Sequence, residues 1–99
     1  MRPFRLTPAA EDDLFDIWSF IAPDNLQAAD GLQAGLLAAC QRIADKPDMG
    51  HWRRDLTDKP VRFFTVRQTY LIVYDPASQP LAVIRVLHGA RDVSAQLEE

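Results

Sequence analysis

Two nearly continuous apolar runs constrain the fold of this chain more than any other feature. They occupy residues 71–73 and 81–84, and the segment between them contains Pro76 in a setting that favours a turn. Strands whose two faces are both covered carry such continuous runs, whereas strands with one wet face alternate. The runs therefore predict neighbouring strands at residues 70–74 and 81–87, inside a sheet or covered on both faces.

Shorter segments extend this sheet. Residues 61–66 predict a strand that a short turn at 67–69 connects to residue 70. Residues 2–6 predict a further short strand, which must join the sheet because a lone strand cannot satisfy its backbone hydrogen bonds. Residues 93–99 predict a last helical turn or a frayed tail.

The first half of the chain predicts two helices. Thr7 is placed as an N-cap with Pro8 at the first helical position, and Pro23 ends the first helix near residue 22. Its apolar positions, spaced i, i+3, i+4 and i+7, are Leu14, Ile17, Trp18 and Ile21. Asp24 or Asn25 caps a second helix that runs to about residue 45.

The short connection between the helices predicts an antiparallel hairpin. The resulting order is β-α-α-β-β-β, an α+β fold with a helical hairpin packed on a curved, mostly antiparallel sheet. A length of 99 residues predicts a single domain spanning residues 1–99.

The charge distribution argues against a general nucleic-acid binder, whose surface is usually basic. The net charge is −3, although residues 51–91 hold seven Lys or Arg against three Asp or Glu. That local excess is either solvated surface or a functional basic face. The chain has no run of the ~20 apolar residues that span a bilayer and no signal-peptide pattern, so we expect a cytoplasmic protein that does not contact membranes.

Nothing in the sequence predicts a metal site or a cofactor. His51 and His88 are far apart, Cys40 lies in an apolar helical stretch, and no Cys/His pair has zinc-site spacing. The acidic residues 11–13 and 16 fit the start of a helix, where the dipole favours negative charge.

Basic residues on and beside the strands are the candidates for a functional site: Arg62, Arg67, Arg85, His88 and Arg91. Brought together, they could bind RNA phosphates, with His88 as a general acid or base. The structural alternative is that Arg85 pairs with an acid such as Asp92. Trp52, beside two arginines, is typical of an interface anchor, and its alternative is a core residue at the sheet edge.

Several motifs are similar to one toxin family. They are Leu6-Thr-Pro-Ala-Ala10, Asp13-Leu-x-x-Ile-Trp18, Met49-Gly50, Val61-Arg-x-Phe64, Tyr70-Leu-Ile-Val-Tyr74 and Arg85-Val-Leu-His-Gly-Ala-Arg-Asp92. On these motifs, the last being the most specific, the chain resembles the ParE branch of the RelE/ParE superfamily of bacterial type II toxin–antitoxin systems. The resemblance spans almost the whole chain.

The resemblance implies the fold described above and a ParD-like antitoxin whose C-terminal segment folds onto the toxin. ParE toxins poison DNA gyrase, whereas RelE toxins cleave mRNA on the ribosome. RelE-like nucleases carry an arginine early in the penultimate strand, where this chain has Leu71, and an apolar side chain cannot stabilise a phosphate transition state. Arg91 matches a second nuclease arginine, and His88 lies close to an acid–base position.

We therefore expect a gyrase inhibitor with no catalytic residues rather than an enzyme. The candidates for target contact are Arg62, Arg67, Arg85, His88, Arg91 and Trp52, and those for antitoxin contact are Leu14, Trp18 and Leu36, each of which is alternatively core. The remaining alternatives are a ribosome-dependent mRNA endoribonuclease and a non-toxic homologue that only binds its antitoxin.

Overall fold

The computed structural model describes residues 1–89 and 91–97, so Ala90 of the His88–Asp92 corner and residues 98–99 of the expected tail lie outside the described residues. The elements are β1 (Phe4–Leu6), α1 (Pro8–Ile21), α2 (Leu26–Asp45), the 3-10 turn η1 (Pro47–Met49), β2 (Arg62–Val66), β3 (Tyr70–Asp75), β4 (Leu81–His88) and α3 (Val93–Leu97). This order confirms the predicted β-α-α-β-β-β arrangement, followed by one short helix.

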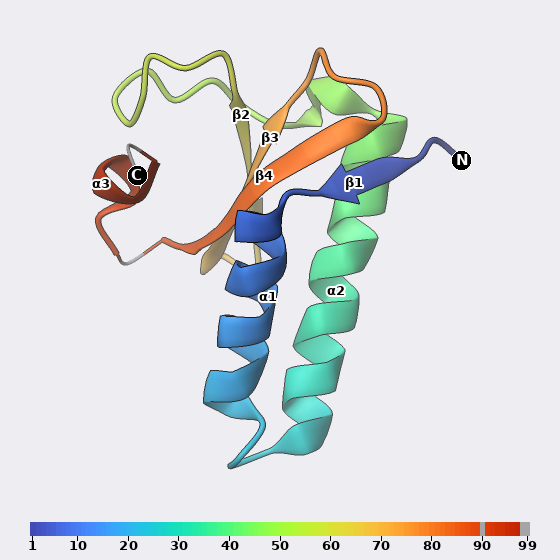
Figure 1. The fold of residues 1–99 in the computed structure, drawn as a ribbon, viewed down its shortest axis with the longest axis vertical. Helices are drawn as coiled ribbons and strands as arrows, with labels where there is room; N and C mark the ends of the chain where they lie inside the picture. Colours follow the sequence, from blue (N-terminus) through green and yellow to red (C-terminus); the bar gives the residue numbers. More distant parts are fainter. Residues whose placement is uncertain (90, 98–99) are drawn as a thin grey trace.

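Both long helices begin at the predicted caps. The Thr7 hydroxyl accepts a hydrogen bond from the Ala10 amide at 3.1 Å, and Pro8 follows it. Asn25, rather than Asp24, caps α2, because its side chain accepts the Ala28 N–H at 3.0 Å. The two helices run antiparallel as a hairpin that extends well beyond the sheet (Figure 1).

The sheet has the strand order β1-β4-β3-β2. β1 pairs parallel with β4, and the other two strand pairs are antiparallel, which confirms a mostly antiparallel sheet that includes the N-terminal strand. β1 is shorter than the predicted residues 2–6, because Phe4 pairs with Leu81, where β4 begins. Residues 2 and 3 therefore have no strand residue beside them.

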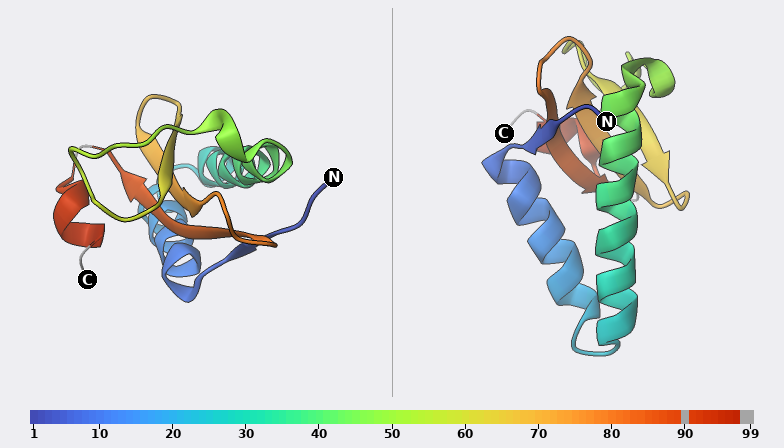
Figure 2. Two further views of the ribbon diagram at one scale, coloured as in Figure 1. Left: turned by 90° about the horizontal axis from the view of Figure 1, so that it is seen from above. Right: turned by 90° about the vertical axis from the view of Figure 1, so that its right-hand side faces the viewer.

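Both faces of the sheet are covered, as the apolar runs predicted. Along β3, Ile72 and Tyr74 belong to the core cluster shared with the helices, whereas Leu71 and Val73 belong to a second cluster on the opposite face. Val93 and Leu97 of α3 complete that second cluster together with Leu56 of the connection between η1 and β2. Figure 2 shows the helical hairpin and α3 on different sides of the sheet.

Candidate functional site

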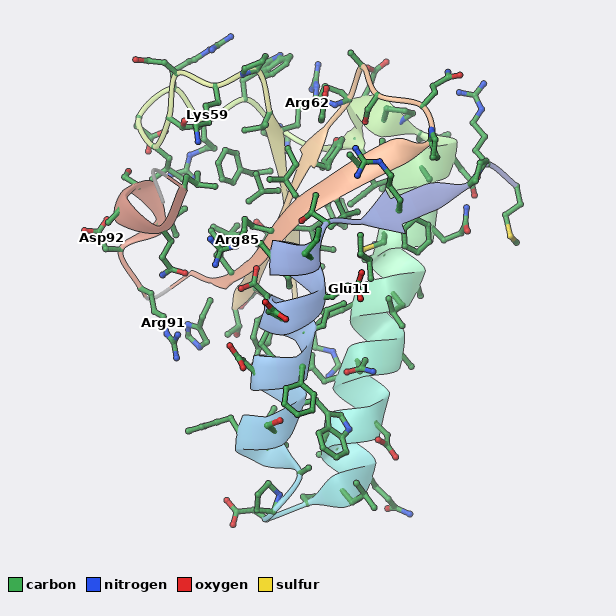
Figure 3. The ribbon with its side chains drawn as sticks, in the orientation of Figure 1. Glu11, Lys59, Arg62, Arg85, Arg91 and Asp92 are labelled. Carbon is green, nitrogen blue, oxygen red and sulfur yellow. The ribbon has the colours of Figure 1, made fainter. Side chains whose placement is uncertain are left out.

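The sheet separates the predicted site residues instead of gathering them. Arg62 pairs with Tyr74 at one end of β3, and His88 pairs with Tyr70 at the other. Four residues of extended strand span about 13 Å. Figure 3 shows Arg62 and Arg91 at different ends of the sheet. We call these the platform end, with Trp52, Arg54 and Arg62, and the groove end, with His88 and Arg91.

Arg85 is a structural residue held by α1. Its Nε and Nη2 groups donate to the two carboxylate oxygens of Asp13 at 2.7 and 2.9 Å, and the two side chains are only 18% and 14% exposed. Its Nη1 donates to the Gln96 carbonyl at 3.0 Å. The acid that pairs with Arg85 is thus Asp13 and not Asp92, which instead accepts the Ala95 N–H at 3.2 Å at the start of α3.

The reason for this pairing lies at the edge of β4. β1 ends at Leu6, opposite Val83, so the rest of β4 has no strand on that side. Thr7 donates its hydroxyl to the Ile84 carbonyl at 2.7 Å, and Asp13 accepts the Val86 N–H at 2.9 Å. The start of α1 therefore supplies hydrogen bonds that a neighbouring strand would otherwise make.

The groove end contains a cavity of about 450 Å³ between α1 and β4. Ile17, Ile21 and Val86 form apolar parts of its lining, and Asp16, His88 and Arg91 add charged or polar groups. His88 packs edge-to-face on Tyr70, with a distance of 5.4 Å between ring centroids. The groove therefore combines an apolar wall with groups of both charges.

Phe20 is a lining residue that the sequence reasoning missed. It is 85% exposed although it is a large aromatic residue, and it lies outside the apolar stripe of α1. A bulky aromatic residue away from the core-facing stripe was the available signal. Phe15, 64% exposed and stacked on Trp18 at 6.4 Å between ring centroids, was missed for the same reason.

Leu71 lies on the opposite sheet face from His88. It pairs with Leu87 in the second cluster, whereas His88 pairs with Tyr70, which packs against the helix-side core. Arg67 is also remote from the groove: it lies in the β2–β3 turn with φ 53°, and its guanidinium is beside Gly35 of α2. His88 and Arg91 are therefore the predicted site residues that share the groove.

The platform end brings Trp52 together with two arginines. The guanidinium carbon of Arg62 lies 4.6 Å from the centroid of the Trp52 ring, and that of Arg54 lies 5.2 Å from it. Trp52 is 42% exposed, so it is an interface candidate and not a core residue. Arg62 also donates through Nη1 to the Gly50 carbonyl at 2.7 Å.

A buried tyrosine anchors the platform. The Gly50 N–H donates to the Tyr74 hydroxyl at 2.8 Å, and that hydroxyl donates to the Pro47 carbonyl at 2.6 Å. Tyr74 is fully buried, and burial raises the pKa of its phenol above the ordinary value. A Cβ atom on Gly50 would lie 2.5 Å from the Tyr74 oxygen, so the close approach of this turn requires glycine.

The three antitoxin candidates differ in accessibility. Leu14 and Leu36 are 6% and 0% exposed and belong to the helix-side core, which agrees with the alternative interpretation of both residues. Trp18 is partly exposed and donates its indole N–H to Asp30 at 2.8 Å. Of the three, Trp18 has the most accessible side chain.

The described residues contain no cluster of metal-binding side chains. Within residues 1–89 and 91–97, no group of three or more His, Cys, Asp or Glu side chains is arranged to hold a metal ion. Burial raises the pKa of the Cys40 thiol to about 12, so this side chain is protonated at neutral pH and not a thiolate nucleophile. In the same part of the chain, no helix has the length and apolar character needed to cross a bilayer.

Comparisons with known proteins agree with the fold. A family model described as ParE toxin of type II toxin-antitoxin system, parDE, matches residues 4–93. A search of the curated proteins found no significant match. A solved chain of the chromosomal ParDE toxin–antitoxin system from P. aeruginosa matches with a TM-score of 0.72 and 15% identity, covering 89% of this chain and 96% of that chain. At this identity, the structural match shows a shared fold.

Proposed function

The chain belongs to the ParE toxin family of type II toxin–antitoxin systems, and from this premise we propose that it inhibits DNA gyrase and that a ParD-like antitoxin neutralises it. Two positions favour gyrase over mRNA as the target: Arg85, which Asp13 holds, and position 71, which is a leucine. Both Asp13 oxygens hold the Arg85 guanidinium, and Leu71 faces away from His88. A toxin that acts by binding needs no catalytic arginine at position 71 or 85.

A second candidate function rests on the groove. His88 and Arg91 line the same cavity, and a histidine beside an arginine is a combination suited to proton transfer next to a phosphate. A ribosome-dependent endoribonuclease therefore stays as the alternative. It would lack an arginine on β3 to stabilise the charge that develops on the phosphate, which is why we rank it second.

The groove and the exposed aromatic residues of α1 support an antitoxin partner. Phe20 lines the groove at 85% exposure, and Phe15 and Trp18 form a stacked pair elsewhere on α1. Large apolar side chains that a small domain leaves in water are typical of a binding surface. A segment that folds on binding suits such a groove, since an amphipathic helix can bury its apolar face there.

Two assays test the proposal with purified protein and in cells. The free chain should block supercoiling of relaxed plasmid by gyrase at near-stoichiometric concentration, and the same chain bound to its antitoxin should not. Induction without antitoxin should stop growth with DNA-damage signalling. If gyrase supercoiling stays intact and induction produces truncated mRNAs, the ribonuclease alternative replaces the gyrase proposal.

Co-purification tests the antitoxin. The small reading frame beside the gene should encode a protein that co-purifies with this chain and restores growth. Phe20→Ala should weaken that complex. If the co-purified protein instead binds Phe20→Ala with the affinity of the wild type, then the groove is not its site.

A further inference from the structure

We propose that Trp52, Arg54 and Arg62 form a preassembled platform that docks an acidic segment of the protein that the toxin inhibits. This inference rests on the proposed function, and it deepens it by assigning the target contact to the platform end. The three residues share one stacked arrangement, with both guanidinium groups over a single indole ring. Trp and Arg are the residue types most enriched at the energetic centres of protein interfaces.

The charge of the platform is available to a partner. Residues 51–62 hold four Lys or Arg against two Asp, in a chain whose net charge is −3. Arg53 already pairs with Asp55 at 2.7 Å. Among the described residues, neither Arg54 nor Arg62 forms an ion pair; Arg54 donates to the Asp58 carbonyl at 3.2 Å, and Arg62 to the Gly50 carbonyl. Carboxylates of a partner are the complementary groups.

Hydrogen bonds within the chain also hold the base of the platform before any partner binds. Its loop starts at a backbone pair, in which His51 and Phe63 exchange two hydrogen bonds of 2.9 Å. Gly50, which holds Arg62, is itself held by the buried Tyr74. Side chains that are already ordered lose little conformational entropy on binding, so more of the contact energy becomes affinity.

Arg62 also carries a buried polar group. Its Nε–H is buried and has no hydrogen-bond partner among the described residues. A buried donor without a partner is unfavourable, and the ordinary fold of a small domain contains few of them. The position of Arg62 therefore rests on the donation from Nη1 to the Gly50 carbonyl and on its stacking over Trp52, and not on its Nε–H.

The features of the platform favour an acidic protein over RNA. Proteins that bind nucleic acid through phosphates neutralise several of them and have an extended basic surface. Here the excess of positive charge is confined to a few residues in a chain of net charge −3. The ring of Trp52 is already contacted by two guanidinium groups, so it is not free to stack a base as single-strand binding sites do.

A pair of charge reversals in one loop tests the platform. Arg54→Glu and Arg53→Glu change the net charge equally, but only Arg54 belongs to the platform. We expect Arg54→Glu and Trp52→Ala each to raise the toxin concentration for half-inhibition of gyrase supercoiling by about tenfold or more, as loss of an interface anchor does. Arg53→Glu should change it less than about threefold. Thermal melting and antitoxin affinity, which should match the wild type, show that each variant is folded.

The outcomes separate this inference from the proposed function. If the wild type inhibits gyrase and all three variants inhibit equally well, or if both reversals weaken inhibition equally, then the platform is overturned and the gyrase assignment stands. If the wild type does not inhibit gyrase, the gyrase assignment fails, and growth arrest on induction becomes the readout. If Arg54→Glu abolishes the arrest and Arg53→Glu preserves it, the result supports the platform. If all variants arrest growth, or if neither they nor the wild type do so, the platform is overturned.

A labelled single-stranded oligoribonucleotide serves as the nucleic-acid probe. If the platform docks an acidic protein, Trp52→Ala and Arg54→Glu should not change the binding of this probe. Tight binding to the wild type that is lost in both variants would assign the platform to RNA and overturn the inference.

Discussion

The middle of β4 and the platform end use the same residue type in opposite ways. In the middle of β4, Arg85 is enclosed in a bidentate pair with Asp13, which also accepts the Val86 N–H. At the platform end, Arg62 lies on Trp52 and donates to a backbone carbonyl. The difference is made by the neighbouring element, since α1 brings a carboxylate to Arg85, whereas residues 50–52 bring a carbonyl and a ring to Arg62. An arginine on a strand is therefore structural or available depending on its neighbour.

The largest effect is expected from Arg85→Ala. Removing one partner of a mostly buried, bidentate pair leaves Asp13 without its counter-charge and should lower the free energy of unfolding by about 2–4 kcal/mol. Urea unfolding followed by circular dichroism measures this loss. The matched control is Arg53→Ala, which breaks the exposed Arg53–Asp55 pair and should leave the unfolding midpoint within experimental error. Similar losses in both variants would contradict the distinction between the mostly buried pair and the exposed pair.

The next effect concerns the turn that holds the platform. Gly50→Ala places a Cβ 2.5 Å from the buried Tyr74 oxygen and should destabilise the fold by about 1–3 kcal/mol as the turn shifts. Gly31→Ala is the control, because nothing lies within 4 Å of its new Cβ on the exposed face of α2. Alanine is the better helix former, so that variant should be more stable by about 0.5–1 kcal/mol. Equal thermal midpoints for the two variants would show that Tyr74 does not restrict the turn.

A smaller and pH-dependent effect is expected from Tyr74→Phe. The change leaves the Gly50 N–H buried without its acceptor and should cost about 1–2 kcal/mol near neutral pH. Because burial raises the pKa of Tyr74, the unfolded chain loses this proton before the folded protein does as the pH rises. The wild type therefore loses stability above about pH 10, the ordinary tyrosine pKa, and its advantage over Tyr74→Phe should narrow there. Unfolding curves from pH 7 to 10.5 that keep a constant gap would refute this.

The smallest effect on stability is expected at the groove rim. Phe20→Ala removes a side chain that is 85% exposed and should change the free energy of unfolding by no more than about 0.5 kcal/mol. The same variant should weaken antitoxin binding, whereas Trp52→Ala should not, if the two ends bind different partners. Isothermal titration of the antitoxin into both variants measures this. Loss of affinity in Trp52→Ala alone would reverse the assignment of the ends.

Local patterns predicted most of the fold. The Thr7 cap, the apolar stripe of α1 and the runs in β3 and β4 each follow from interactions within a few residues or from burial on both faces. The helix–helix hairpin follows from a short connection. These features need no knowledge of distant contacts, so a single sequence contains them.

The sites were harder to predict because they depend on contacts between distant residues. Asp13 and Arg85 are 72 positions apart, so sequence proximity suggested Asp92 as the partner instead. Spacing also placed the basic residues in one region, but the register puts Arg62 and His88 at opposite ends of β3. The irregularity between Val73 and Tyr74, which shifts the register of β4, has no marker such as glycine at that point.

The parallel pairing of β1 with β4 has a consequence for the order in which the protein is made. Phe4 pairs with Leu81, so the first strand to be synthesised waits for the last before it finds its neighbour. The loop closed by this pairing runs from residue 4 to residue 81, about three quarters of the chain, and such distant contacts are formed slowly. During translation, Thr7 and Asp13 of the α1 start likewise lack the β4 backbone groups with which they form hydrogen bonds. A nascent chain that stops before residue 81 therefore lacks the pairing that places its first strand in the sheet.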